Sequence, residues 1–192
     1  MNTAIYIILG IVVIIALAIL INYVIVVINA IKKNKTIKKS LGSSTKIRII
    51  YQLKEALEAL SKTKTGAIIT IENNNNLDLL RTDGIILDAN ISSSLLISIF
   101  NKHSPLHDGA VVIRNNKIYY AATFYKITKK SIDNKYGARH RASLGISEMS
   151  DSSTLIVSEE NGGITLAENG TLQAVPIENL QSILGRIFKD TK

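Results

Sequence analysis

The sequence predicts an α/β fold, α+β-like in its order of elements, with a mixed central β-sheet flanked by helices and preceded by one N-terminal transmembrane helix. Three observations predict it: an uncharged apolar run opens the chain, an amphipathic helical pattern follows, and short strand patterns then alternate with helical ones. A length of 192 residues suits one domain with a short additional segment.

Residues 1–31 hold the apolar run. No charged residue occurs from Ala4 to Ile31, and only Asn22 and Asn29 are strongly polar. About 20 apolar residues suffice to cross a bilayer. A cleaved signal peptide, the alternative, would carry basic residues before a shorter apolar region, whereas here the lysines follow it. Residues 1–31 are therefore predicted to form an uncleaved single-pass span.

Basic residues are concentrated just after this span. Residues 32–64 carry ten Lys and Arg against two Glu, whereas residues 65–192 carry thirteen basic and thirteen acidic residues. Because Lys and Arg near a span stay on the cytoplasmic side, we expect a cell-membrane protein whose remaining chain is cytoplasmic. The basic juxtamembrane linker, residues 32–45, would lie against membrane lipids, either in specific recognition or as a solvated flank. A basic flank of this kind is not the footprint of a nucleic-acid-binding domain, so no nucleic-acid partner is expected.

Residues 46–62 are predicted to form an amphipathic helix. Its apolar side chains recur at helical spacing and share one face: Ile47, Ile50, Leu53, Leu57 and Leu60. This face would pack on the folded domain, and docking against a helix of a membrane assembly is the alternative.

The remaining elements are short. Strand patterns occupy residues 66–72, 109–114, 117–125, 153–158, 163–168 and 171–176, and helical patterns occupy residues 92–102, 138–149 and 177–188. Asn115-Asn116 predicts a hairpin turn, Pro105 is expected to end the helix 92–102, and residues 87–90 lead into that helix. We find no internal repeat.

Several common chemistries are excluded. The chain has no Cys, so it contains no disulfide, zinc–thiolate site or Cys nucleophile. It also lacks a P-loop, a dinucleotide-binding glycine loop, a His-Glu-x-x-His zinc helix and a Gly-x-Ser-x-Gly elbow. Three polar clusters at the ends of predicted elements remain as candidates.

The first cluster is Ser104–Ala110, where His107 and Asp108 precede an apolar strand and Gly109 permits close backbone approach. An Asp at this place can ligate a hard cation or accept a proton from a hydroxyl, and the adjacent His can join the cation. An Asp-Gly turn with a capping His is the alternative.

The other two clusters offer charge of opposite sign. Arg139, His140 and Arg141 begin a predicted helix, where two guanidiniums suit a polyphosphate, although a solvated surface is the alternative. Ser158-Glu159-Glu160 ends a strand and could hold a metal or a ribose hydroxyl, or form an exposed loop. Together the three clusters supply what metal-dependent nucleotidyl transfer needs.

The residues in and around these clusters resemble the diadenylate cyclase (DAC) domain, over about residues 65–176. Four segments carry the resemblance in the family's order: LDANIS (87–92), SPLHDGAVVI (104–113), GARHRASLGISEMSD (137–151) and VSEENGGITLAENGTL (157–172). A single span followed by this domain is similar to the single-span membrane cyclases of mycoplasmas.

The resemblance implies an enzyme, a nucleotidyltransferase that condenses two ATP into the second messenger cyclic di-AMP with release of two pyrophosphates, with Mg²⁺ or Mn²⁺ as cofactor. Two protomers would meet face to face so that each ribose 3′-hydroxyl attacks the other nucleotide's α-phosphorus, which implies a homodimer or higher homo-oligomer. A regulatory protein that blocks the shared face is a further expected partner. The cytosolic cyclase domain would comprise residues 46–192.

The resemblance also implies the site residues, and it places the adenine pocket at the end of the strand pattern 117–125. The implied catalytic residues are Asp108, Gly109, Arg139, His140 and Arg141; the implied nucleotide-binding residues are Ala110, Phe124, Tyr125, Ala138, Ser158 and Glu159; and the implied metal ligands are Asp108, His107 and Glu160.

One position departs from the family's pattern, which has Thr where this chain has Ala138. A hydrogen bond to a charged phosphate is worth about 1.5–3 kcal/mol, so we expect a weaker site or a compensating contact. Two alternatives to an active cyclase stay open. One is a membrane-bound module that senses ATP or the cyclic product without turnover, and the other is a lipid-anchored scaffold that uses the basic flank and the amphipathic helix.

Overall fold

A computed structural model describes residues 2–36 and 42–190, in two units that divide near residue 40. The first unit is a single helix, α1 (Asn2–Thr36), and its stretch Leu9–Val26 is long and apolar enough to cross a membrane. The predicted N-terminal apolar helix is therefore confirmed. Helix α1 continues into the segment 32–45 expected to be a linker, and residues 37–41 of that segment lie outside the described residues.

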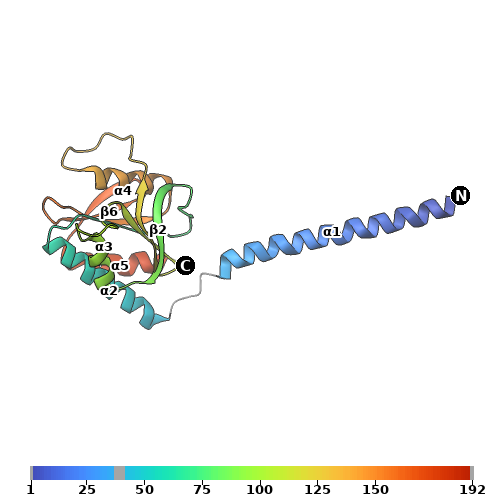
Figure 1. The fold of residues 1–192 in the computed structure, drawn as a ribbon, viewed down its shortest axis with the longest axis horizontal. Helices are drawn as coiled ribbons and strands as arrows, with labels where there is room; N and C mark the ends of the chain where they lie inside the picture. The colour runs from blue at the N-terminus through green and yellow to red at the C-terminus, as the bar shows by residue number, and fades with distance from the viewer. Residues whose placement is uncertain (1, 37–41, 191–192) are drawn as a thin grey trace. The chain divides into compact units, whose positions relative to one another are not determined.

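The second unit is built on one seven-stranded mixed sheet (Figure 1), which confirms the predicted fold class. The strand order is β2-β4-β3-β1-β5-β6-β7, with β1 parallel to β3 and every other neighbouring pair antiparallel. The strands are β1 (Ala67–Ile71), β2 (Arg81–Asn90), β3 (Ala110–Arg114), β4 (Lys117–Tyr125), β5 (Ser153–Val157), β6 (Ile164–Glu168) and β7 (Thr171–Val175).

Helices cover both faces of the sheet (Figure 1). Helices α2 (Ser43–Lys62), α3 (Ser93–Phe100) and α5 (Leu180–Asp190) share one core with the sheet, and α4 (Ala138–Met149) packs on the opposite face. A short 3₁₀ turn, η1 (Ile177–Asn179), precedes α5, where the sequence predicted one continuous helix over 177–188. Side chains alternate between the two cores along β1, so Ile69 packs with the three-helix side and Ile68 with the α4 side.

Helix α2 packs on the sheet through a face that differs from the prediction at its first turns. Leu53, Leu57 and Leu60 are buried as expected, and Ile49 joins them at 1% exposure, whereas Ile47 is 64% exposed. Ile49 lies one turn before Leu53 on the same side, while six residues make about 1.7 turns and carry Ile47 away from that side. The face thus packs on the domain, as predicted, but Ile47 does not belong to it.

Strand β2 is an edge strand that the sequence patterns did not indicate. Residues 87–90, expected to lead into a helix, form the end of this ten-residue strand, which pairs with β4. Its exposed and half-buried positions do not alternate, Asp83 and Asp88 have positive φ, and the pairing shifts register between Ile86 and Ala89. These irregularities remove the period of two by which a strand is recognised.

The sequence signals for the end of α3 and for the turn between β3 and β4 had different outcomes. Ser92 caps α3, its hydroxyl accepting the Leu95 N–H at 3.3 Å, and the helix ends at Phe100 because Asn101 is extended. The expectation that Pro105 ends this helix is therefore wrong. The hairpin between β3 and β4 is confirmed, and Asn115 and Asn116 both have positive φ, as a two-residue hairpin turn requires.

Candidate functional site

The strand registers bring two of the three predicted clusters, those of Asp108 and Ser158, to one end of the sheet. Ala67 pairs with Val157, and Ala110 pairs with Thr123, in the row of neighbouring strands β4-β3-β1-β5. The first residues of β1 and β3 therefore lie at the same end as the last residues of β4 and β5. Asp108, Phe124 and Ser158 are thus all placed around this end of the sheet.

The start of helix α4 and the loop after β5 line one small pocket of about 70 Å³. Its lining residues are Lys135, Gly137, Ala138, Arg139, His140, Val157, Ser158, Glu159 and Glu160. Two of the three predicted clusters therefore meet in space, and six of the predicted site residues line the pocket. Arg141 is not among the lining residues, and Lys135 is a lining residue that the sequence analysis did not single out.

Arg139 crosses this pocket toward the loop. Its Nη1 lies 2.7 Å from Glu159 Oε2, and its side chain is 28% exposed. Helix α4 begins at Ala138 after Gly137, which provides no side-chain cap for the first N–H groups. Uncapped N–H groups and a guanidinium beside a helix N-terminus form an environment suited to an anion such as a phosphate.

His140 is buried beneath the pocket, at 6% exposure, and its ring centroid lies 5.0 Å from that of Tyr136. Burial lowers the pKa of His140, and the nearby Arg139 cation lowers it further, while Glu160 acts in the opposite direction. The imidazole is therefore neutral near pH 7. The Arg141 carbonyl accepts the Thr128 N–H at 3.0 Å, which ties the chain segment after β4 to helix α4.

The loop after β5 is closed by its own hydrogen bonds. The Ser158 N–H donates to the Gly163 carbonyl at 2.9 Å, and the Gly162 N–H donates to the Ser158 carbonyl at 2.9 Å. The Ser158 hydroxyl accepts the Glu160 N–H at 3.3 Å. Glu159 and Glu160 are both exposed on this closed loop.

The Asp108 turn is determined by Gly109. The Asp108 carboxylate accepts the Gly109 N–H at 3.0 Å, and Gly109 has φ +93°. A Cβ on Gly109 would lie 2.6 Å from the Thr123 carbonyl oxygen, so no other residue fits here without moving β4. His107 Nδ1 lies 2.7 Å from the Ser104 carbonyl, which only accepts, so Nδ1 carries the proton and Nε2 is the nitrogen left for a metal.

The two candidate adenine residues differ in exposure. Phe124 is 41% exposed, whereas Tyr125 is buried in the core between the sheet and α4, together with Ala110 and Ile146. Burial raises the pKa of Tyr125 above its usual value. Phe124 is therefore the residue of this pair that presents an open ring to a ligand.

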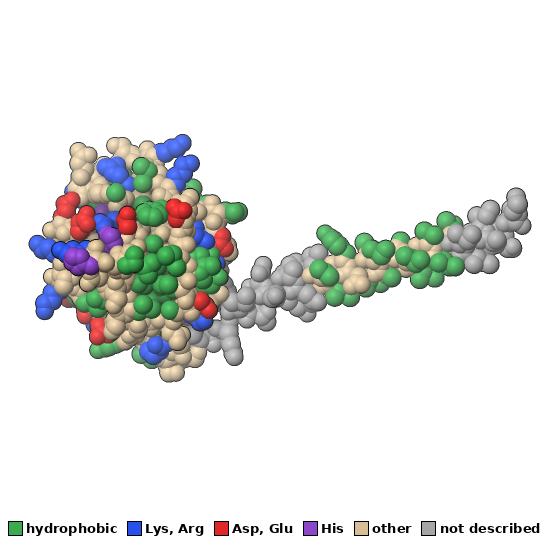
Figure 2. Space-filling model, viewed as in Figure 1, with side chains coloured by type: hydrophobic (Ala, Val, Ile, Leu, Met, Phe, Trp, Pro, Cys, Tyr) green, Lys and Arg blue, Asp and Glu red, His purple; other side chains and the backbone are tan. Residues whose placement is uncertain are grey.

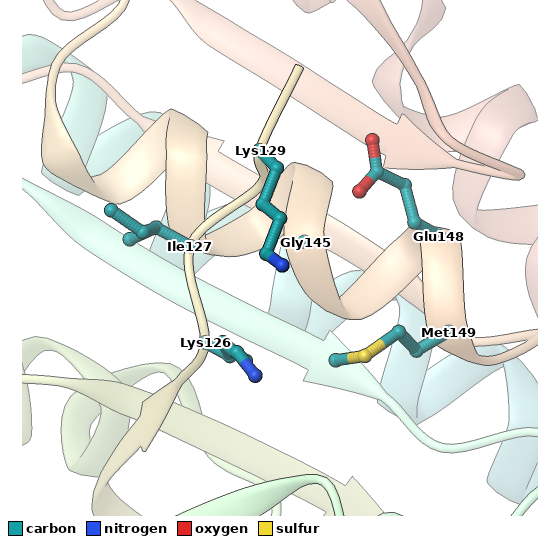
Figure 3. Close-up of a pocket in the computed structure, with 6 residues that line it drawn as sticks. All are labelled: Lys126, Ile127, Lys129, Gly145, Glu148 and Met149. Atoms are coloured by element: carbon teal, nitrogen blue, oxygen red, sulfur yellow. The ribbon is translucent and has the colours of Figure 1, made fainter.

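A second pocket, of about 210 Å³, lies between helix α4 and the chain segment after β4 (Figure 3). Its lining residues are Lys126, Ile127, Lys129, Gly145, Glu148 and Met149. Glu148 accepts the Thr128 hydroxyl at 2.9 Å and pairs with Lys130 at 3.1 Å. Gly145, Glu148 and Met149 lie within the segment 137–151 that carries the family resemblance, but the sequence analysis assigned no site role to any of the six lining residues.

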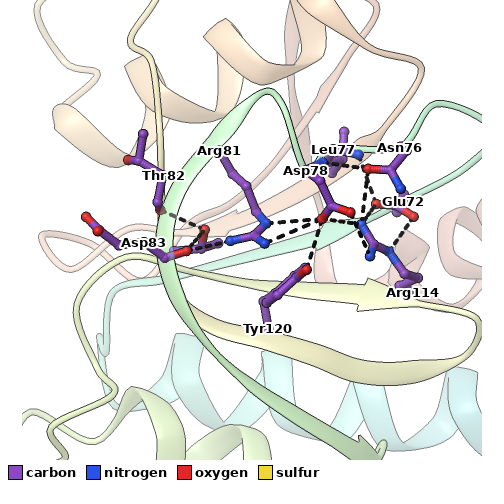
Figure 4. Close-up of polar contacts among 10 residues, drawn as sticks. Glu72, Asn76, Leu77, Asp78, Arg81, Thr82, Asp83, Arg114 and Tyr120 are labelled. Carbon is purple, nitrogen blue, oxygen red and sulfur yellow. Dashed lines mark hydrogen bonds and ion pairs between the residues drawn. The ribbon is translucent and has the colours of Figure 1, made fainter.

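A charged network at the start of β2 was also missed (Figure 4). Arg114 Nε and Nη2 each lie 2.7 Å from an oxygen of Glu72, and Nη2 lies 2.8 Å from Asp78 Oδ1. Tyr120 donates its hydroxyl to Asp78 at 3.0 Å. The hydrogen bond from Arg114 lowers the pKa of Asp78 to about 2. The network ties the segment between β1 and β2 to β3 and β4.

Apolar side chains also reach the surface. Figure 2 shows a patch of them on one face of the second unit, beside acidic, basic and histidine side chains. On the edge strand β2, Ile85 and Ile86 are 52% and 61% exposed.

The donor set is compatible with a hard divalent cation. Within residues 2–36 and 42–190, no group of three or more His, Asp or Glu side chains converges as a metal cage. Asp108 and Glu160 are exposed carboxylates, which are the oxygen donors that Mg²⁺ prefers. Mg²⁺ usually takes only one or two carboxylates and completes its shell with water and substrate phosphates, so these residues fit a metal that binds together with a nucleotide.

Comparison with known proteins identifies the family of the chain. A mixed α/β fold whose pocket combines an uncapped helix N-terminus, an arginine and two carboxylates is suited to a ligand that carries phosphate groups. The chain belongs to the DAC family, described as DisA bacterial checkpoint controller nucleotide-binding, which it matches over residues 54–172. The resemblance seen in the sequence is therefore confirmed.

Individual relatives and a solved structure are similar over most of this chain. It is 42% identical over 144 residues to cyclic di-AMP synthase CdaA of Bacillus subtilis (strain 168), covering 74% of this chain and 53% of that protein. It is 41% identical over 138 residues to the diadenylate cyclase of Mycoplasma genitalium, covering 71% and 69%. The crystal structure of a DacA double mutant from Staphylococcus aureus matches with a TM-score of 0.71 at 37% identity, covering 73% of this chain and 95% of that one. The chain spans about half the length of the first curated relatives it matches.

Proposed function

We propose that the chain is a diadenylate cyclase, which condenses two ATP into cyclic di-AMP and two pyrophosphates. Membership of the DAC family supports this activity, as do relatives named cyclic di-AMP synthase and diadenylate cyclase. The observation that carries the proposal is the pocket in which the first residues of α4 meet the loop after β5. The strand registers place the Asp108 turn at the same end of the sheet.

Asp108 is proposed to act on the attacking hydroxyl. As the ribose 3′-oxygen bonds to the α-phosphorus of the second ATP, its proton passes to the Asp108 carboxylate, the bond to the bridging oxygen of the β-phosphate breaks, and pyrophosphate leaves. The carboxylate is exposed, and the Gly109 N–H holds it in place at 3.0 Å. Because Gly109 and Ala110 present little or no side chain at this turn, the nucleotide can lie close to the backbone.

The start of α4 is proposed to bind the phosphates. Arg139 lines the pocket together with the first residues of the helix, whose N–H groups have no side-chain cap, and Arg141 follows on the same helix. Neutral His140 would orient a phosphate by hydrogen bonding. Ser158 and Glu159 complete the wall opposite the helix, where the hydroxyl can donate to a phosphate oxygen.

Mg²⁺ or Mn²⁺ is the proposed cofactor. Asp108 and Glu160 would hold it through carboxylate oxygens, with His107 Nε2 as a third candidate. When bound, the cation neutralises phosphate charge and lowers the pKa of a coordinated hydroxyl. Its ligands in the complete site would include phosphate oxygens of ATP.

The adenine base is proposed to lie near the end of β4. The exposed ring of Phe124 can stack on a purine, and buried Tyr125 supports the wall beneath it. Ala138 lines the pocket at the first position of α4 without a hydroxyl, so its contribution to phosphate binding comes from the backbone alone.

The proposed oligomer follows from the need for two nucleotides, and the proposed membrane location follows from the N-terminal apolar helix. One protomer offers one such pocket among its described residues, and the product needs two nucleotides, so we propose a face-to-face homodimer or higher homo-oligomer. Residues 1–31 would anchor the protein in the cell membrane, residues 32–45 would lie against lipid headgroups, and residues 46–192 would form the cytoplasmic catalytic domain. A regulatory protein could act by covering the shared face.

A second candidate function, ATP or cyclic-product sensing without turnover, is favoured by one observation. Ala138 stands where the family's pattern has Thr, so this chain lacks a hydroxyl that could stabilise phosphate charge during turnover. Such a module would bind ATP in the same pocket and release no pyrophosphate.

The test is product formation by the full chain in detergent micelles. Incubation with ATP and Mg²⁺ or Mn²⁺ is expected to yield cyclic di-AMP and pyrophosphate, identified by mass. The variant Asp108→Asn is expected to keep the fold and lose the product. ATP recovered unaltered from folded protein that binds it would favour the sensor instead, and undiminished turnover by Asp108→Asn would remove Asp108 from the mechanism.

A further inference from the structure

Buried Gly66 lies directly beneath the Arg139 guanidinium. Gly66 precedes β1, and a Cβ atom on it would lie 2.7 Å from Arg139 Cζ, 2.8 Å from Nη1 and 3.0 Å from Nε. Three atoms of one planar group at similar distances mean that the guanidinium lies across this backbone position. Gly66 does not have a positive φ, so it is the close approach of Arg139, and not the backbone conformation, that leaves no room for a side chain.

The Arg139 guanidinium contacts a second group, the Glu159 carboxylate. We call the backbone of Gly66 and this carboxylate together the seat of the guanidinium. Glu159 Oε2 lies 2.7 Å from Arg139 Nη1, and the pairing of Ala67 with Val157 brings the start of β1 beside the strand that leads to Glu159. The Glu159 side chain is 63% exposed, and ion pairs with an exposed partner are weak by themselves. Packing over Gly66 is a second contact that restricts the orientation of Arg139.

We propose that Gly66 is a positioning residue, whose missing side chain allows Arg139 to lie where it meets the phosphates of ATP. This inference rests on the proposed function, in which Arg139 is a phosphate ligand. Gly66 itself lines no pocket wall named above and would touch no substrate. It acts only through the orientation of Arg139.

The substitution Gly66→Ala should move the side chain and spare the backbone. The atoms that the new Cβ would meet belong to the far end of a flexible arginine, which can swing away. The variant is expected to fold, with a Tm within about 4 °C of the wild type. Loss of one hydrogen bond to a charged phosphate should lower kcat/KM for ATP by about 10- to 100-fold.

The experiment uses the full chain in detergent micelles and two readouts. The first is modification of Arg139 by phenylglyoxal, followed by peptide mass spectrometry with Arg114, whose side chain is 12% exposed, as the reference arginine. The second is kcat/KM for cyclic di-AMP formation in Gly66→Ala, Arg139→Ala and the double variant. Gly185→Ala is the matched control, because Gly185 has no atom within 4 Å of an added Cβ.

We expect Gly66→Ala to raise the labelling rate of Arg139 severalfold and to lower kcat/KM in the presence of Arg139 but not in the Arg139→Ala background. Gly185→Ala should change neither readout. Unchanged labelling of Arg139 would overturn the proposal, and so would an equal loss of kcat/KM in both backgrounds. A wild-type chain that makes no cyclic di-AMP would overturn the proposed function instead, while the labelling still decides whether Gly66 seats Arg139.

Discussion

Replacing Arg114 by Met should destabilise the second unit strongly, because it removes the cation from a nearly buried ion pair. The side chains of Arg114 and Glu72 are only 12% and 9% exposed, and two hydrogen bonds of 2.7 Å join them. Arg114→Met keeps most of the apolar stem and leaves the Glu72 carboxylate with the Leu77 N–H, at 3.1 Å, as a remaining donor.

The magnitude follows from the burial of the pair. Breaking a buried ion pair by removing one partner costs about 3–5 kcal/mol, because the other charge is left uncompensated. Asp78 adds little to this figure, since its side chain is 40% exposed and water screens its charge. For a domain of this size each kcal/mol shifts Tm by about 2–4 °C, so Arg114→Met should lower Tm by about 6–20 °C.

The assay is differential scanning calorimetry of the full chain in detergent, with Lys117→Met as the matched control. Lys117 pairs with Asp88 at 3.0 Å, but the two side chains are 42% and 56% exposed, so its loss should cost no more than about 1 kcal/mol. The double variant Glu72→Gln with Arg114→Met should regain part of the lost Tm. If Arg114→Met and Lys117→Met lower Tm equally, burial does not determine the strength of this network.

Three further predictions concern the site and its titration. Ala138→Thr, which adds a hydroxyl at an exposed first position of α4, should lower KM for ATP without changing Tm; an unchanged KM would show that backbone contacts suffice there. Gly109→Ala should lower the unfolding free energy by about 1–3 kcal/mol from φ strain alone, and by more from the clash with Thr123, measured by chemical denaturation. Burial places the pKa of His140 below its value in the unfolded chain. Its contribution to stability is therefore present above about pH 6.5 and is lost as the pH falls. His140→Gln should flatten the pH dependence of Tm on that acidic side.

The fold was predictable where one physical signal decided each element. The apolar helix follows from the length of an uncharged run, and the hairpin follows from two adjacent residues that tolerate positive φ, Asn115 and Asn116. Strand β2 could not be recognised in the same way. An edge strand with Gly84 and two aspartates at positive φ has no alternating pattern, and only its pairing with β4 makes it a strand.

The candidate site was likewise predictable from the sequence only in part. Arg139, Ser158 and Glu159 were marked by local motifs, and the structure brings them into one pocket because α4, which carries Arg139, packs against β5, the strand that leads to Ser158 and Glu159.

Gly66 had no such mark, since in the sequence it was only the first residue of the strand pattern 66–72. Its role arises only when helix α4, more than seventy positions later in the chain, lays a guanidinium across it. A sequence motif can thus identify the charged residues of a site. It cannot identify Gly66, because the lack of a side chain matters there only through its contact with Arg139 in the folded protein.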